Sequence, residues 1–273
     1  GIHRYTFPAG TQPTVLIDPS AVLGEGTASN VWIEVLPDGQ EIVGGMTNHG
    51  SLSGRYGGQP IYFSALFKTP FDRFGVFSDG QLFPDQSTMS GDERLGAYVQ
   101  LEASGDTRVE LAMGISYISV DQARLNRELE ASDWNFDAVR ADAEAVWADA
   151  LSVIDVEGGT DLERRVFYSA LYHTQMMPTL YTDVNGLYPG FDRQTHQAEG
   201  FTYYTDLSLW DTFRTLHPLL NLIAPDRQGD LITSMLHMHA QAGFIDRWPQ
   251  GNGPTGCMVG DSPAIVIAES YLK

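Results

Sequence analysis

The sequence is poor in cysteine, in basic residues and in long apolar runs, and each shortage argues against a class of protein. The one cysteine, Cys257, allows no disulfide within the chain, and a lone thiol of this kind is expected to be buried and inert. No run of about 18 apolar residues occurs, so no membrane span is expected. The sequence has 16 basic and 35 acidic residues. The resulting net charge of −19 argues against nucleic acid and anionic membranes as partners.

The remaining composition is that of a folded protein. Of the 273 residues, 42% are hydrophobic and 11% aromatic, enough for the core of one large domain or of two ordinary ones. No charged and then apolar leader opens the sequence. It starts in a strand-like stretch, residues 1–7, and stops in a helix-like one, so both ends are expected to lie inside a longer protein.

The first 120 residues carry a β pattern. Segments rich in β-branched and aromatic residues predict strands at 15–18, 31–36, 61–67, 96–101, 109–113 and 115–120. Turn residues are expected to separate them at Pro37-Asp38-Gly39, Gly44-Gly45, Gly57-Gly58 and Asp79-Gly80. Many short strands joined by such turns predict an antiparallel β-sandwich.

From residue 121 the apolar period changes from two to about 3.6. Helices are expected at 121–131 and 135–151, at 160–177 behind the capping box Thr160–Glu163, from Trp210 through Leu222, from Pro225, and over 264–272. The predicted domains are a β-sandwich at 1–120, a helical connector at 121–155, and the first part of an all-α toroid at 156–273.

One stretch, residues 204–214, contains side chains that can bind a sugar. Trp210, Asp211 and Arg214 fall within one helical turn. An indole can stack on the apolar face of a sugar, while a carboxylate and a guanidinium bind its hydroxyl rim. The alternative is a buried helix start in which Asp211 pairs with Arg214, three positions on.

Two loops are further candidates. The 182–190 loop has an Asp-x-Asn-Gly pattern, but the later ligands of an EF-hand are missing, so a plain turn is expected. The 248–261 loop, rich in glycine and proline, either binds a ligand or connects elements. His237 and His239 are two positions apart and would face different ways on a helix, which makes them a poor metal pair.

In these residues the chain resembles glycoside hydrolase family 92, the calcium-dependent exo-acting α-mannosidases. The resemblance covers about residues 115–273 and rests on Ser116–Ser119, the helix through Trp147, Phe167–Tyr172 with Pro178, Asp183–Gly186, Ser208–Arg214, Trp248–Asn252, Met258–Gly260 and Ala268–Lys273. It implies a supersandwich-like N-terminal domain and an (α/α)6 catalytic domain. The β-rich part fits more loosely.

The same resemblance implies an inverting glycosidase that removes terminal α-linked mannose, with an α-1,2 linkage favoured, from mannose-containing glycans. Trp210 and Asp211 would line the mannose pocket with Asn252 and Met258 close by. Arg214 would orient Asp211, and Trp248 is either a pocket wall or packing at a domain interface. Calcium is the implied cofactor, its ligands unknown, and a secreted or periplasmic location is implied.

The catalytic acid and base of the family are not found. An inverting glycosidase needs two carboxyl groups about 6.5–9.5 Å apart. No Gly-Asn-Glu-Pro or Asn-Asp-Asp motif occurs, and both groups are expected beyond Lys273. The second half also holds five carboxylates to which neither role can be assigned, at Glu199, Asp206, Asp246, Asp261 and Glu269. The chain alone is therefore expected to be inactive, or to act with the remaining segment of the same enzyme.

Two other functions stay open at this point. The sandwich face carrying Trp32 and Tyr62 could make the chain a non-catalytic carbohydrate-binding module. A helical interaction protein without a ligand is the third possibility.

Overall fold

The structure is a computed structural model that describes residues 1–50, 52–102, 107–131 and 133–273. The chain divides into two compact units, Gly1–Val139 and Arg140–Lys273. The proposed connector, residues 121–155, therefore contributes to both units.

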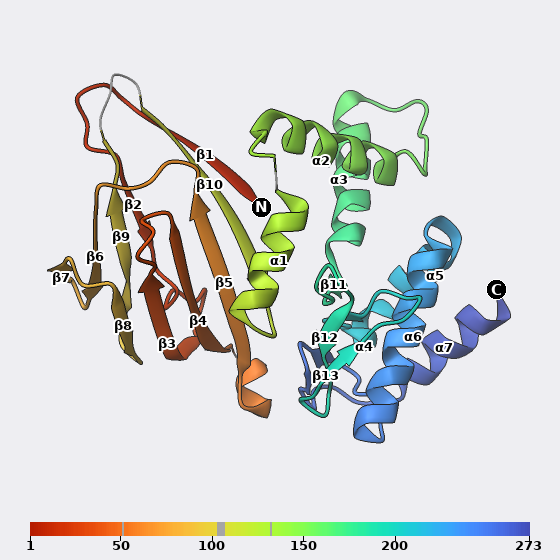
Figure 1. The fold of residues 1–273 in the computed structure, drawn as a ribbon. Coiled ribbons are helices and arrows are strands. Elements are labelled where there is room, and N and C mark those ends of the chain that lie inside the picture. The colour runs from red at the N-terminus through yellow and green to blue at the C-terminus, as the bar shows by residue number, and fades with distance from the viewer. Residues whose placement is uncertain (51, 103–106, 132) are drawn as a thin grey trace. The chain divides into compact units, whose positions relative to one another are not determined.

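The first unit is the antiparallel β-sandwich that the sequence predicts (Figure 1). One sheet has six strands in the order β1-β10-β5-β4-β3-β8 and the other has four, in the order β2-β9-β6-β7. The bounds are β1 Ile2–Phe7, β2 Thr14–Ile17, β3 Thr27–Val35, β4 Glu41–His49, β5 Gln59–Phe67, β6 Arg73–Ser78, β7 Gln81–Pro84, β8 Thr88–Gly91, β9 Leu95–Gln100 and β10 Thr107–Ser116, with a short 3-10 helix at Ser53–Tyr56.

Alternating apolar residues of both sheets form the core of the sandwich. Ile33 and Ile42 of the larger sheet and Leu95 and Val99 of the smaller one are fully or almost fully buried in one cluster. The strand expected at 109–113 lies within β10, which ends at Ser116, so the strand expected at 115–120 is wrong beyond its first two residues and helix α1 (Val120–Glu130) begins at its last. Ser119 caps that helix with its side-chain oxygen.

The expected turn at Gly44-Gly45 is wrong, because both glycines lie in the middle of β4. A Cβ on Gly44 would stand 2.6 Å from a Phe63 ring carbon, and one on Gly45 would stand 3.0 Å from Trp32 Nε1 and from Tyr62 Cδ1. Glycine is needed here because large rings from the neighbouring strands occupy the space of a side chain.

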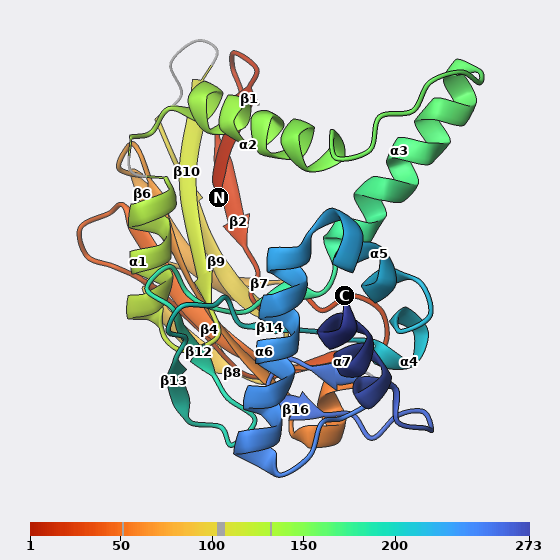
Figure 2. The same cartoon turned by 90° about the vertical axis from the view of Figure 1, so that its right-hand side faces the viewer.

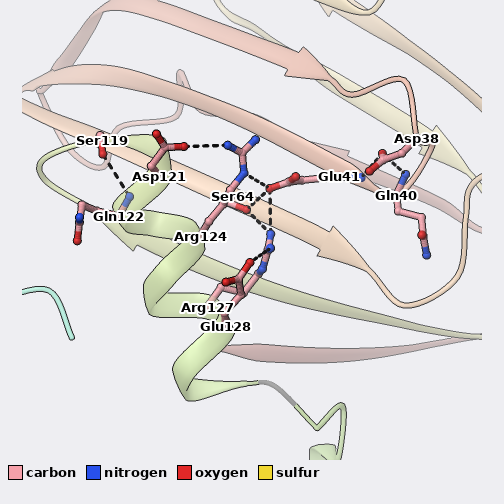
Figure 3. A network of polar contacts seen from close by, with 10 residues as sticks. All are labelled: Asp38, Gln40, Glu41, Ser64, Ser119, Asp121, Gln122, Arg124, Arg127 and Glu128. Carbon is pink, nitrogen blue, oxygen red and sulfur yellow. Dashed lines mark hydrogen bonds and ion pairs between the residues drawn. The ribbon is translucent and has the colours of Figure 1, made fainter. Parts of the chain in front are cut away.

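Helix α1 packs on β10 and β5, and a charge network ties it to β4 and β5 (Figure 3). Glu41 of β4 accepts hydrogen bonds from Arg124 Nε at 2.9 Å, Arg127 Nη1 at 3.0 Å and the Ser64 hydroxyl at 2.6 Å. Burial alone would raise the pKa of Glu41, but these hydrogen bonds together lower it below its usual value. The network fixes the helix on the sheet.

The second unit contains α3 to α7 and three small two-stranded sheets. Helices α5, α6 and α7 pack on one another (Figure 2). The bounds are α2 Phe136–Leu151, which spans the division between the units, α3 Asp161–Met176, α4 Leu209–Thr212, α5 Leu216–Ile223, α6 Pro225–Ala242 and α7 Ser262–Leu272, with β11 Thr179–Leu180, β12 Leu187–Pro189, β13 Thr195–Gln197, β14 Tyr204–Thr205, β15 Pro249–Gln250 and β16 Gly253–Pro254.

The helix expected from Trp210 through Leu222 is interrupted. It forms α4 and α5, separated by residues 213–215. Pro218 has no N–H and its ring would clash with the carbonyl of residue 214 in a continuous helix, so the chain restarts and places proline in the first turn of α5. Within the described residues, no helix combines the length and the apolar character needed to cross a membrane.

Candidate functional site

The Trp210 segment and the glycine-rich loop are joined by three hydrogen bonds. Leu207 N donates to Pro249 O at 3.1 Å, Gly251 N donates to Asp206 Oδ1 at 3.1 Å, and the Thr205 hydroxyl donates to Gly251 O at 2.6 Å. We call these three contacts the clasp. It holds together the two stretches that the sequence proposes as a site.

Asp246 organises the glycine-rich loop from within. Its Oδ2 accepts from Thr255 N at 2.8 Å, Gly256 N at 3.3 Å and the Thr255 hydroxyl at 3.2 Å, and the residue is buried. That hydroxyl also lies 2.7 Å from Trp248 O, and its single proton is donated to one of these two oxygens at a time. A carboxylate that binds several backbone N–H groups fixes a loop that has almost no regular structure.

Two residues in these loops adopt the left-handed backbone conformation. Asp206 has φ 58° and Met258 has φ 63°. A non-glycine residue in this region costs about 1–3 kcal/mol unless its side chain compensates, and strain of this kind clusters at functional sites. The Asp206 carboxylate compensates by accepting the Gly251 N–H.

Trp210 is half-buried, and both Asp211 and Arg214 are exposed. In the described residues no ion pair joins Asp211 to Arg214, as the alternative interpretation of this helix start would require, and the role of Arg214 in orienting Asp211 stays a prediction. Instead Arg214 Nη1 donates to the Trp210 carbonyl, and its guanidinium carbon lies 5.0 Å from the Trp210 ring centroid and 4.4 Å from that of Phe213. The guanidinium thus contacts two rings and a carbonyl rather than the Asp211 carboxylate.

The other candidate residues lie on the loop that Asp246 organises. Trp248 and Asn252 are half-buried, and Met258 is 44% exposed. Cys257 was expected to be buried and is half-buried; Arg247 Nε binds its carbonyl at 3.3 Å. The structure therefore joins the Trp248–Asn252 stretch to the Trp210 segment through the clasp, while Met258 lies farther along the same loop.

Sequence reasoning missed an aromatic cluster that supports this part of the unit. The rings of Tyr188 and Tyr203 stack with centroids 3.9 Å apart, and His196 stacks on Tyr188 at 5.7 Å. Gln241 Nε2 of α6 donates to the Tyr188 hydroxyl at 3.1 Å. Burial raises the pKa of Tyr203 well above its usual value. The tyrosines have no periodic spacing, so the sequence offers no signal for this cluster.

A second missed group joins α5, α6 and α7. His217 is 1% exposed, its Nδ1 lies 3.0 Å from Gln228 Oε1, and Gln228 Nε2 donates to the Ser270 hydroxyl at 3.0 Å. Burial lowers the pKa of His217, which keeps the imidazole neutral near pH 7. A neutral ring then donates Nδ1–H to Gln228.

The side chains that the structure describes do not assemble a metal centre. Among them, no three His, Cys, Asp or Glu side chains gather closely enough to hold an ion. The Asp-x-Asn-Gly loop is the turn that the sequence predicts, since Gly186 N donates to Asp183 O at 2.8 Å and Leu187 N to Asn185 Oδ1 at 3.3 Å. These residues alone therefore do not fit a calcium site.

Of the five unassigned carboxylates, Asp206 and Asp246 bind backbone N–H groups. Glu269 pairs with Lys273 at 2.7 Å, and Glu199 and Asp261 are exposed. These contacts assign neither the acid nor the base role to any of the five.

Comparison with known proteins accounts for almost the whole chain. The model of the Glycosyl hydrolase family 92 N-terminal domain matches residues 1–116, and that of the Glycosyl hydrolase family 92 catalytic domain matches residues 122–273. A protein of Arthroderma benhamiae described as an uncharacterized secreted glycosidase is 39% identical over 135 residues, which are 44% of this chain and 18% of that protein.

Solved structures agree with both halves. The fold is similar to that of a family GH92 α-mannosidase from Bacteroides thetaiotaomicron, with a TM-score of 0.89 and 26% identity over 98% of this chain. It is also similar to a family GH92 inverting mannosidase from the same species, with a TM-score of 0.88 and 25% identity over 99% of this chain. The chain spans 36% of the length of each of these two proteins. With both family models matched in sequence order, the chain belongs to glycosyl hydrolase family 92.

Proposed function

We propose that this chain is the sugar-recognition part of an α-mannosidase that removes terminal α-linked mannose from glycans with inversion, and that α-1,2 linkages are preferred. The observation that carries the proposal is the clasp, which joins residues 205–207, just before the Trp210–Asp211 pair, to the Trp248–Asn252 loop within a family 92 catalytic domain. The solved proteins to which the chain is similar are described as α-mannosidases.

In this proposal each side chain has a binding role. The half-buried Trp210 indole stacks on the apolar face of mannose, and the exposed Asp211 carboxylate accepts hydrogen bonds from its hydroxyl groups. Asn252 and Trp248 border the sugar from the loop that Asp246 holds. Asp206 and Asp246 shape the loop, since each accepts backbone N–H groups on one carboxylate oxygen.

The chemistry needs groups that this chain does not supply. Protonation of the leaving oxygen and activation of water require two carboxyl groups facing the sugar from opposite sides. We place both outside these 273 residues, together with ligands for calcium, whose charge would bind vicinal hydroxyls of mannose. The complete enzyme is proposed to be secreted or periplasmic.

Calorimetry with methyl α-mannoside tests the binding role. We expect weak binding by the wild-type chain and none by Asp211→Ala, while Asp149→Ala, which removes an exposed carboxylate from α2, binds as the wild type does. Binding that survives Asp211→Ala would place the sugar elsewhere. An assay on an aryl α-mannoside with calcium tests the second part, since turnover by this chain alone would show that it contains the acid and base.

One observation favours a second candidate, a carbohydrate-binding surface on the sandwich. Trp32 of β3 and Tyr62 of β5 flank Gly45 of β4, and both rings lie close to the position of its missing side chain. Both residues are half-buried, and such an aromatic pair can form a platform for a sugar ring. Mannoside binding abolished by Trp32→Ala and insensitive to Asp211→Ala would favour this function.

A further inference from the structure

Arg214 occupies a position that the family comparison does not explain. Its guanidinium carbon lies 5.0 Å from the Trp210 ring centroid and 4.4 Å from the Phe213 ring centroid, and its Nη1 donates to the Trp210 carbonyl. A planar guanidinium at these distances gains both stacking and cation–π attraction. Two aromatic rings and one carbonyl oxygen thus hold this side chain, although the residue is exposed.

The backbone around Trp210 offers little to hold its indole. Helix α4 has only four residues, and no side-chain hydrogen bond caps its start. A single helical turn is not stable by itself, because most helix stability comes from packing, so it does not fix the Trp210 rotamer. The Arg214 contacts add a constraint on the ring to the packing of α4 against α7.

The same contacts leave Asp211 available. A carboxylate and a guanidinium three residues apart on a helix commonly pair. Here the guanidinium lies against Trp210 and Phe213, and within the described residues no ion pair involves the exposed Asp211. A carboxylate without a cation partner keeps its oxygens for hydroxyl donors.

We propose that Arg214 is a positioning residue, which holds the Trp210 indole from one side and so leaves the rest of the ring and the Asp211 carboxylate to a hexose. Its effect on sugar binding rests on the proposed function, whereas its effect on Trp210 does not. Lysine cannot replace it, because an ammonium has neither the planar surface nor the fork that binds the carbonyl while stacking.

Fluorine NMR of the whole chain labelled with 5-fluorotryptophan tests the effect on Trp210 without any sugar. The five tryptophans give five resonances, and the resonance that is absent in Trp210→Phe is assigned to Trp210. We expect Arg214→Ala and Arg214→Lys to shift the Trp210 resonance and to increase its H2O/D2O isotope shift. Arg165→Ala, which removes an exposed arginine from α3, should leave it unchanged. An unaltered Trp210 resonance in Arg214→Ala, or wild-type behaviour of Arg214→Lys, overturns the proposal.

Titration of the same samples with methyl α-mannoside tests the consequence for binding. The wild-type Trp210 resonance should respond to the sugar, and Arg214→Ala should weaken the affinity about fivefold. Unchanged affinity alongside an altered Trp210 resonance would overturn the role in sugar binding. A wild-type resonance that ignores the sugar would count against the proposed function, while the sugar-free spectra still decide whether Arg214 holds the indole.

Discussion

Replacing Glu41 by glutamine should destabilise the sandwich unit more than any surface change in it. The substitution removes the charge that faces Arg124 and Arg127, and the side chains of Glu41 and Arg127 are only 10% and 6% exposed. Removing one partner of a buried ion pair costs about 3–5 kcal/mol. We expect the lower end, about 3 kcal/mol, because Arg124 is 32% exposed and can turn toward water.

Native-state hydrogen exchange measures this loss within the sandwich unit. Peptides from β5 and α1 report the opening of this unit separately from the helical one. In urea the midpoint should fall by about 2 M, for a slope of about 1.5 kcal/mol per M. A loss below about 1 kcal/mol would refute the reasoning, because it would mean that the network is hydrated in solution.

The dependence on pH provides an independent check. The carboxyl pKa of Glu41 is lowered in the folded state, so its contribution to stability is complete above the ordinary value of 4.5 and disappears as the pH falls through the lower folded value. The difference between wild type and Glu41→Gln should close over that interval. The double variant Glu41→Leu/Arg127→Leu is the control. It should recover most of the stability that Glu41→Gln loses, because it removes both buried charges and leaves neither Glu41 nor Arg127 as an unpaired one.

Other predictions follow from single contacts. Burial lowers the pKa of His217 in the folded state, so as the pH falls the unfolded chain takes up the imidazole proton before the folded one does. Wild-type stability in urea titrations should therefore fall as the pH drops below 6.5, and His217→Gln should lose this dependence. Gly114→Ala should prevent α1 from docking and melt the sandwich unit at lower temperature, because the new Cβ would stand 2.0 Å from the Ala123 carbonyl. Gly229→Ala, in open space on α6, should raise the free energy of unfolding by about 0.5–1 kcal/mol. Asp206→Asn, which keeps an acceptor and tolerates positive φ, should leave mannoside affinity nearly intact, whereas Asp206→Ala should reduce it in calorimetry.

Local signals made much of the fold predictable. The capping box at Thr160 is present in full, with Thr160 N donating to Glu163 Oε2 at 2.7 Å and Glu163 N to the Thr160 hydroxyl at 3.3 Å. The turn at Pro37-Asp38-Gly39 joins β3 to β4, and Gly39 has a positive φ of 69°. Such features depend on residues within one turn of each other, and a sequence displays those directly.

Features that depend on distant partners were not predictable. The glycines of β4 have a turn-like composition, and only the rings of Phe63, Trp32 and Tyr62 on adjacent strands explain them. The acceptor role of Asp206 depends on Gly251, 45 residues away. A single sequence gives no information on such pairs, so Asp206 was grouped with carboxylates of unknown role.

The contacts of the carboxylates bear on our proposal that recognition and chemistry belong to different parts of the enzyme. A catalytic carboxyl group needs an oxygen free to reach the sugar or its attacking water. Asp246 is buried with two backbone N–H donors on one oxygen, Asp206 is in the clasp, and Glu269 pairs with Lys273. Asp211 is exposed, which suits it to bind hydroxyl groups. We therefore propose that the carboxylates of this chain shape the loop and bind hydroxyl groups, and that the acid and base lie in another part of the enzyme.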